Sequence, residues 1–211
     1  MTAEFGHELE GYLAKNGISK TQAARAADID PTHLIRVTHS ERELGPNNLI
    51  LLIDAIGIPL QDQAMFLLQG MSVPKQVAQE WLSAFVKTDE ELAPMVAIEE
   101  IKEHIPQGQY SKFATLLPIN ITNFLKIIHG HRGMGRVTAL HIAQKLEIPN
   151  KKRAQFFLTE VGLEFKDIKR VLENHRNALT PEQKVIMALG YKPNSIAVKW
   201  GIDPIAQTIL R

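Results

Sequence analysis

The chain has 211 residues, a formal net charge of +1 and 45% hydrophobic residues, which is enough to bury one large core or two small ones. It contains no cysteine, which excludes disulfides, thiolate nucleophiles and Cys-based zinc sites. The opening stretch, MTAEFGHELE, carries acidic residues where a secretory signal needs basic and then apolar ones, and no apolar run approaches the ~20 residues of a membrane span. We therefore expect a cytoplasmic protein without a membrane association.

The spacing of apolar residues predicts an all-α fold. Strand signals are few, because no Asn-Gly or Asp-Gly turn lies between alternating segments. Apolar residues instead recur at intervals of three and four, as in Val77, Trp81, Leu82 and Phe85. That spacing is typical of amphipathic helices.

The region 18–59 shows two short helices in succession. Ser19 followed by Gln22 is a capping-box pattern, so a helix should begin at Ser19 and present a face of small alanines. Asp30 should cap a second helix, with Pro31 at its first position and its end near Thr38. Two such helices joined by a turn have the helix-turn-helix geometry, which places the second helix in a DNA major groove.

A further helix is expected over 47–56, ending at Gly57 and Pro59. The whole stretch ISKTQAARAADIDPTHLIRVTHSERELGPNNLILLIDAIGIP resembles the Cro and lambda-repressor-like (xenobiotic-response-element type) DNA-binding family, a bundle of about five helices. The resemblance rests on six apolar positions: Ala24, Ile29, Leu34, Val37, Ile53 and Ile56. It departs from the family's usual residues at Lys20, Asp28, Thr38 and Ser40.

An internal repeat supports this interpretation. A shift of 90 residues aligns a first copy, residues 19–68, with a second copy, residues 109–158, without a gap and with 11 identities in 50 positions. Average composition would give about three. The identities include Ala24 with Ala114, Gly45 with Gly135 and Pro59 with Pro149. The alternative is that any two clusters of amphipathic helices share such periodicity.

The two copies differ in charge. Residues 1–60 hold five Lys and Arg against eight Asp and Glu, a balance of −3, whereas residues 101–160 hold nine against three, a balance of +6. Because neutralisation of phosphates dominates the affinity of DNA-binding proteins, the second copy should contribute more attraction to DNA. The second copy also has Pro118 where the first has Asp28, and proline cannot adopt the left-handed conformation usual at this turn, so its turn should follow another path.

The family resemblance implies which side chains would contact DNA. The positions that meet base edges correspond to Pro31, Thr32, His33 and Arg36 in the first copy and to Ile121, Thr122, Asn123 and Lys126 in the second, with Arg36 suited to guanine and Asn123 to adenine. Phosphate contacts would come from Lys20, Arg42, Tyr110, Lys112, His131 and Arg132. The alternative for each residue is an exposed side chain without a specific partner.

Other motifs do not predict catalysis or a metal. His129, His131 and His141 lack a carboxylate or thiolate at ligand spacing, and Glu90, Glu91, Glu99 and Glu100 are typical of a solvated helix surface. No P-loop, GxSxG or GxGxxG motif is present in the sequence. We expect no enzymatic activity, no cofactor and no metal.

The segments around the copies should also be helical. Residues 72–86 and 165–172 each follow a copy, and each is expected to pack on its neighbour or on another chain. Thr180 and Pro181 should begin a helix to about Leu189, and residues 195–204 echo residues 23–31 as a truncated third hairpin. The predicted division is 1–70, a first helix-turn-helix bundle; 71–96, a helical connector; 97–162, a second bundle; and 163–211, a helical C-terminal extension.

These patterns favour sequence-specific binding of double-stranded DNA by a bacterial, phage or plasmid transcriptional regulator. The alternative is an antitoxin-like adaptor that holds a protein partner on one or both bundles, which the acidic first copy motivates. Independently of the function, Ile205, Ile209 and Leu210 at the C-terminal end should pack either on the second copy or across a homodimer formed through the C-terminal extension.

Overall fold

The computed structural model describes residues 3–88, 90–106, 108–146 and 148–188. This part of the chain forms helices and no strands, so the predicted all-α class is confirmed for it. None of its helices has the length and the apolar character that crossing a bilayer requires. The residues of the predicted third hairpin, 195–204, and Ile205, Ile209 and Leu210 lie outside the described residues.

The helices form two successive series that match in order. The N-terminal unit, residues 3–86, contains α1 (Ala3–Lys15), α2 (Lys20–Ala26), α3 (Pro31–Thr38), α4 (Pro46–Ala55), α5 (Leu60–Gly70) and α6 (Lys75–Val86). The C-terminal unit, residues 97–178, contains α7 (Ala97–His104), α8 (Tyr110–Ala114), α9 (Ile121–Ile128), α10 (Arg136–Lys145), α11 (Asn150–Glu160) and α12 (Phe165–Ala178). From α3 with α9 to α6 with α12, each pair of helices begins 90 residues apart, and α13 (Pro181–Ala188) follows α12.

Side chains close to each helix end determine where several of the helices begin. Ser19 and Gln22 form the expected capping box, in which the Gln22 amide N–H donates to Ser19 Oγ at 3.1 Å. Asp30 caps α3 by accepting from the His33 amide at 2.9 Å, and Asn120 caps α9 by accepting from the Asn123 amide at 2.8 Å. The two units therefore begin their third helices by the same hydrogen bond, from residues that differ in charge.

The turn that precedes the third helix differs between the units. Asp28 has φ +54, the left-handed conformation expected there, and the Ile29 amide closes the end of α2 by donating to the Ala24 carbonyl at 2.8 Å. Pro118 cannot take that conformation. Accordingly, α8 stops at Ala114, and six residues link it to α9, whereas four residues link α2 to α3.

The predicted core residues are buried. The side chains of Ala24, Leu34, Val37 and Ile53 are fully shielded from solvent, and Ile29 and Ile56 are at most 6% exposed. Their counterparts Phe124 and Ile127 anchor α9 in the same way. The helix expected over 47–56 begins one residue earlier, at Pro46, because Gly45 takes the extended conformation of the N-cap.

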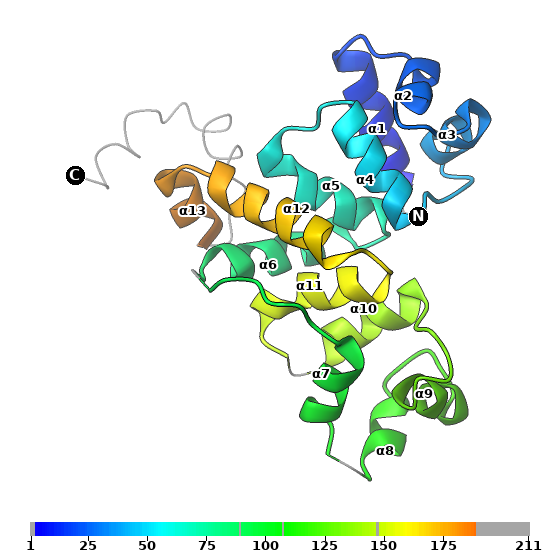
Figure 1. The fold of residues 1–211 in the computed structure, drawn as a ribbon, viewed down its shortest axis with the longest axis vertical. Helices are drawn as coiled ribbons and strands as arrows, with labels where there is room; N and C mark the ends of the chain where they lie inside the picture. Colours follow the sequence, from blue (N-terminus) through cyan, green and yellow to red (C-terminus); the bar gives the residue numbers. More distant parts are fainter. Residues whose placement is uncertain (1–2, 89, 107, 147, 189–211) are drawn as a thin grey trace.

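The two units join by exchanging their last helices. Helix α6 of the N-terminal unit packs on α11 of the C-terminal unit, and α12 packs on α5 (Figure 1). The helix expected over 165–172 extends to Ala178, and its buried His175 contacts the carbonyl of Gln61 on α5. Since α5 corresponds to α11 and α6 to α12, these two contacts are reciprocal, which is the pattern of a two-fold dimer interface within one chain.

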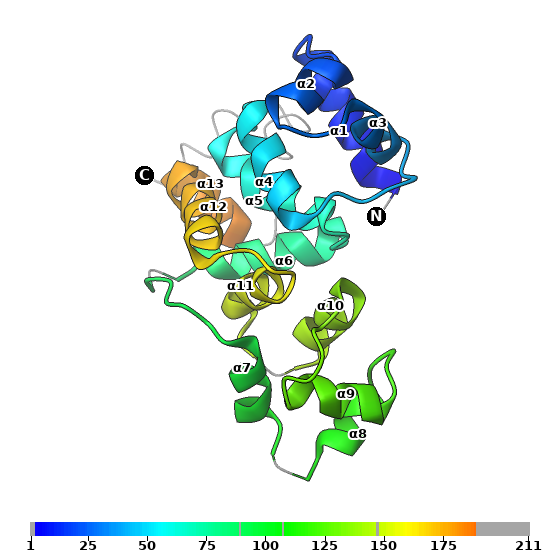
Figure 2. The same cartoon turned by 45° about the vertical axis from the view of Figure 1, so that its right-hand side comes forward.

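Aromatic and ionic contacts bridge the same junction. Trp81 of α6 is 1% exposed and packs against Phe157 of α11, with ring centroids 6.0 Å apart. The Arg170 guanidinium on α12 forms a two-pronged contact with Asp54 of α4, at 2.7 and 3.0 Å. The four helices α5, α6, α11 and α12 therefore form a central layer, with α2 and α3 at one end of the molecule and α8 and α9 at the other (Figure 2).

Candidate nucleic-acid interface

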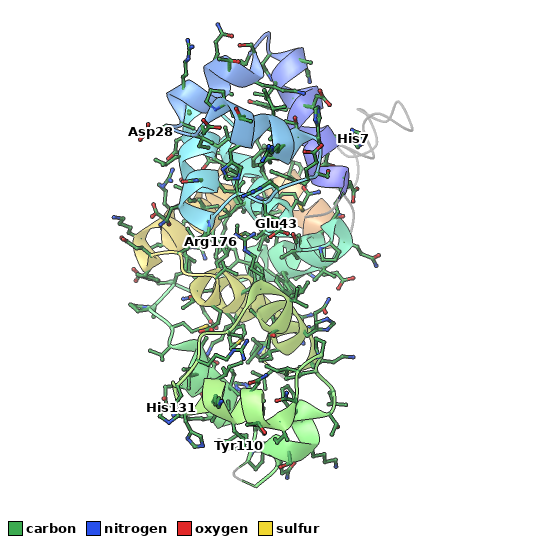
Figure 3. All side chains as sticks on the ribbon, turned by 90° about the vertical axis from the view of Figure 1, so that its right-hand side faces the viewer. His7, Asp28, Glu43, Tyr110, His131 and Arg176 are labelled. Atoms are coloured by element: carbon green, nitrogen blue, oxygen red, sulfur yellow. The ribbon has the colours of Figure 1, made fainter. Side chains whose placement is uncertain are left out.

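Helices α3 and α9 lie on the same side of the molecule. Figures 1 and 2 place both helices at the right-hand side, toward opposite ends, and Figure 3 looks directly at that side. Glu43 lies between the two ends in Figure 3, whereas Asp28 and His131 lie toward the edges of the view. One face of the protein thus presents the third helix of both units.

In the N-terminal unit, the predicted contact residues gather on one patch of surface. Thr32, His33, Arg36 and Arg42 line a shallow depression of about 220 Å³ together with the capping residue Asp30. Arg36 and Arg42 are exposed, and neither forms an ion pair with a residue that the structure describes. The sequence-based choice of these four side chains therefore corresponds to a contiguous surface.

Two of the predicted residues in this unit already form hydrogen bonds or ion pairs within the protein. The His33 ring nitrogen Nε2 lies 3.2 Å from the carbonyl oxygen of Glu43, which can only accept, so the ring donates this hydrogen bond. The Lys20 ammonium lies 2.6 Å from Glu10 Oε1, and its hydrogen bond and charge lower the pKa of Glu10. A phosphate at Lys20 would therefore have to compete with a carboxylate.

In the C-terminal unit, the predicted residues are more accessible. Thr122, Lys126, His131 and Arg132 are exposed along and after α9, and Asn123 is half-buried. Within the described ranges, neither basic side chain of this group, Lys126 or Arg132, has a carboxylate partner. These two cations are therefore available to phosphates.

Helix α8 supplies two further predicted contacts. Lys112 is exposed, whereas Tyr110 is half-buried and its ring packs on Phe124, 6.4 Å between centroids. Phe113 also packs on Phe124, at 5.8 Å. Since Phe124 is the fully buried anchor of α9, α8 and α9 are joined through this aromatic cluster.

The sequence did not indicate Arg136, which connects the two units on this face. Its guanidinium donates to Glu43 Oε2 at 2.9 Å and to the Leu44 carbonyl at 2.8 Å. Arg136 is the first residue of α10, and Glu43 and Leu44 lie just before Gly45, the N-cap of α4. The two contacts therefore tie the α3–α4 loop to the helix that follows α9. The aligned residue of the N-terminal unit is Pro46, so the replacement of a proline by an arginine was the difference between the copies that could have drawn attention to Arg136.

One cluster has the composition of a metal site. Ligand atoms of Glu100, Glu103 and His104 on α7 lie within 4.8 Å of one another, whereas the described histidines His129, His131 and His141 do not form such a group. The Lys152 ammonium lies 3.1 Å from Glu100 Oε1 and already supplies positive charge there. The arrangement is that of an ion pair between α7 and α11.

Comparison of the chain with models of protein families, with curated proteins and with solved structures found no match.

Proposed function

We propose that this protein binds double-stranded DNA as a transcriptional regulator, with α2–α3 and α8–α9 acting as two helix-turn-helix motifs. The proposal identifies the two units as tandem bundles like those of Cro and lambda repressor, followed by a helical extension. It assigns no catalytic role to the protein. One observation carries it: α3 and α9, each capped by the same hydrogen bond, share one face of the molecule (Figure 3).

The exposed and half-buried side chains of these helices suit the grooves of DNA. Arg36 carries a planar guanidinium that can donate two hydrogen bonds to guanine, and Asn123 can pair with adenine in the same two-pronged manner. Arg42, Lys112, Lys126 and Arg132 are placed to neutralise phosphates, and three of these four cations belong to the C-terminal unit. That unit should therefore provide most of the salt-dependent affinity.

The exchanged helices explain how one chain would engage a full binding site. Single-bundle proteins of this type pair as dimers so that two recognition helices enter successive major grooves about 34 Å apart. Here, the reciprocal contacts of α6 with α11 and of α5 with α12 hold two units within one chain. Because α3 and α9 carry different side chains, the preferred site is asymmetric rather than palindromic.

Selection from a random duplex library, followed by fluorescence anisotropy on the selected site, tests this function. Lys126→Ala and Arg132→Ala should each weaken binding more than Arg36→Ala and should each reduce the slope of log K against log salt by about 0.9. Lys87→Ala, at an exposed lysine after α6, is the matched control and should leave the slope unchanged. Failure to enrich any sequence would contradict the proposal, and so would a selected site on which neither Lys126→Ala nor Arg132→Ala changes the slope.

The acidic surface of the N-terminal unit favours a second candidate, an adaptor that holds a basic protein partner. Asp28 and Asp30 flank the start of α3 and are exposed, and exposed Glu41 follows its end. Such charges oppose phosphates and attract cations. Binding of a basic peptide to the N-terminal face, with an affinity that Lys126→Ala leaves unchanged, would favour this function over DNA binding.

A further inference from the structure

The C-terminal unit contains a cavity that is open to solvent, between α7, α8 and the end of α10. Its volume is about 470 Å³, within the range of sites for small molecules. Four polar side chains line it, His104, Gln109, Lys112 and Lys145. Apolar walls come from Phe113 and Leu116.

The corresponding space of the N-terminal unit is crossed by a tyrosine. Buried residues recur every four positions on α1, at Phe5, Leu9 and Leu13, and along α7 to its C-cap, at Ala97, Ile101 and Ile105. This match aligns Tyr12 with His104. The Tyr12 ring packs on the core, and its hydroxyl donates to the Gly57 carbonyl at the end of α4, at 2.9 Å.

Among the described residues of the C-terminal unit, no side chain makes the equivalent contact across the cavity. The His104 ring lies 2.9 Å from the Glu100 carbonyl of its own helix, so the nitrogen Nδ1 donates within α7. Leu116 lies on the wall with 57% of its surface exposed, although it is a large apolar side chain. The shorter side chain at position 104 and the early end of α8 therefore leave the space open.

The charges at the cavity are specific to this unit. Lys112 and Lys145 align with Gln22 and Ala55, so the N-terminal unit has neither lysine at this place. Both are exposed, and no carboxylate among the described residues forms an ion pair with either. Two ammonium groups beside apolar and aromatic walls match an organic anion with an apolar body.

We propose that this cavity is a binding site for a small aromatic or aliphatic carboxylate and that its occupant regulates α9. Phe113 forms a wall of the cavity and also packs on Phe124, the buried anchor of α9. Lys112 is both a cavity residue and a candidate phosphate contact. A bound carboxylate would draw Lys112 away from the phosphate and reduce DNA affinity, an effect that rests on the proposed function, whereas the binding itself does not.

The test uses 2-naphthoate as the probe with the full-length chain, followed by calorimetry and by amide chemical shifts. One equivalent should bind, with shifts concentrated at Ile105, Phe113 and Leu146. Neutral 2-naphthamide should bind at least about tenfold more weakly, as expected for loss of a charge-assisted hydrogen bond.

Variants distinguish the cavity from other apolar surfaces. His104→Tyr restores the side chain that fills the other unit and should abolish binding, with circular dichroism confirming its helices. Lys112→Gln and Lys145→Gln should each weaken binding about tenfold, whereas the control Lys87→Gln should not change it. Unchanged affinity in all three cavity variants, or shifts confined to other regions, would overturn the site.

Anisotropy with labelled duplex separates the two claims. A fall in DNA affinity at saturating naphthoate, absent in His104→Tyr, supports the regulation. Naphthoate binding with unaltered DNA affinity would overturn the regulation while leaving the DNA-binding function in place. Naphthoate binding by a protein that binds no duplex would contradict the proposed function and leave the cavity as a ligand site.

Discussion

Replacing Leu172 with alanine should destabilise both units at once. Leu172 is fully buried on α12, the helix of the C-terminal unit that packs on α5 of the N-terminal unit. A buried Leu→Ala replacement costs about 2–5 kcal/mol, because the lost transfer energy adds to the cost of the cavity. With about 3 kcal/mol lost, the melting temperature of a chain of this size should fall by roughly 6–12 °C.

Native-state hydrogen exchange provides the assay that locates this effect. If the units unfold together, the free energy of opening should fall by the same amount for the slowest amides of α5 and of α11. Leu51→Ala, at a leucine of α4 that is 48% exposed, is the matched control and should change the free energy of unfolding by about 0.5 kcal/mol or less. Undiminished protection in α5, with loss confined to α11 and α12, would refute the argument that the exchanged helices make one cooperative unit.

Three other predictions concern particular contacts. Asp30→Ala and Asn120→Ala each remove a helix cap and should each cost about 1 kcal/mol in urea unfolding; a loss in only one unit would contradict their equivalence. Burial lowers the pKa of His175, against the hydrogen bond to the Gln61 carbonyl. The stability that the neutral His175 contributes is therefore complete above the unfolded-state pKa of about 6.5 and is lost at up to about 1.4 kcal/mol per pH unit below it. His175→Gln should flatten the dependence of the unfolding free energy on pH between about pH 7.5 and 5.5. An unchanged dependence would exclude this histidine as its source. The Arg170 pair with Asp54 is partly exposed, so a double-mutant cycle with alanine at both positions should give a coupling energy of about 0.5–1 kcal/mol, and a value near zero would show that the pair adds nothing to the junction.

The features predicted well from the sequence are those determined by local chemistry. Ser19 and Asp30 cap their helices as expected, since a cap depends on a side chain and an amide three residues later. The position of Pro118 likewise predicted that the second turn would differ, because a proline ring restricts its own backbone. Thr180 similarly caps α13, with its hydroxyl accepting from the Gln183 amide at 3.2 Å.

The features that the sequence did not predict depend on long-range packing. The helices that follow each copy, α6 and α12, were expected to pack on a neighbour or on another chain. Periodicity cannot distinguish the two arrangements, since an apolar stripe does not specify its partner. The contact of Arg136 with Glu43 joins residues 93 positions apart. The cavity beside His104 lies where the stretch between Ile105 and Tyr110 is two residues shorter than the matching stretch between Leu13 and Lys20, and the gapless alignment from residue 19 onward did not include this difference.

The predicted DNA-contact residues can be located in the structure, which does not test what they bind. Thr32, His33, Arg36 and Arg42 were chosen from the family resemblance, and the structure brings them onto one surface. The engagement of Lys20 by Glu10 was not foreseen, because the two residues lie on different helices. Base and phosphate contacts remain predictions for all of these residues.

Hydroxyl-radical footprinting on a selected duplex, with one protein chain bound per duplex, tests the central claim most directly. If α3 and α9 act together from one face of a single chain, one bound protein should protect two segments centred about 10–10.5 base pairs apart on the same side of the duplex. Lys126→Ala and Arg132→Ala should weaken the segment contacted by the C-terminal unit first. Protection of a single segment by one chain, or of two segments only when two chains are bound, would contradict the account.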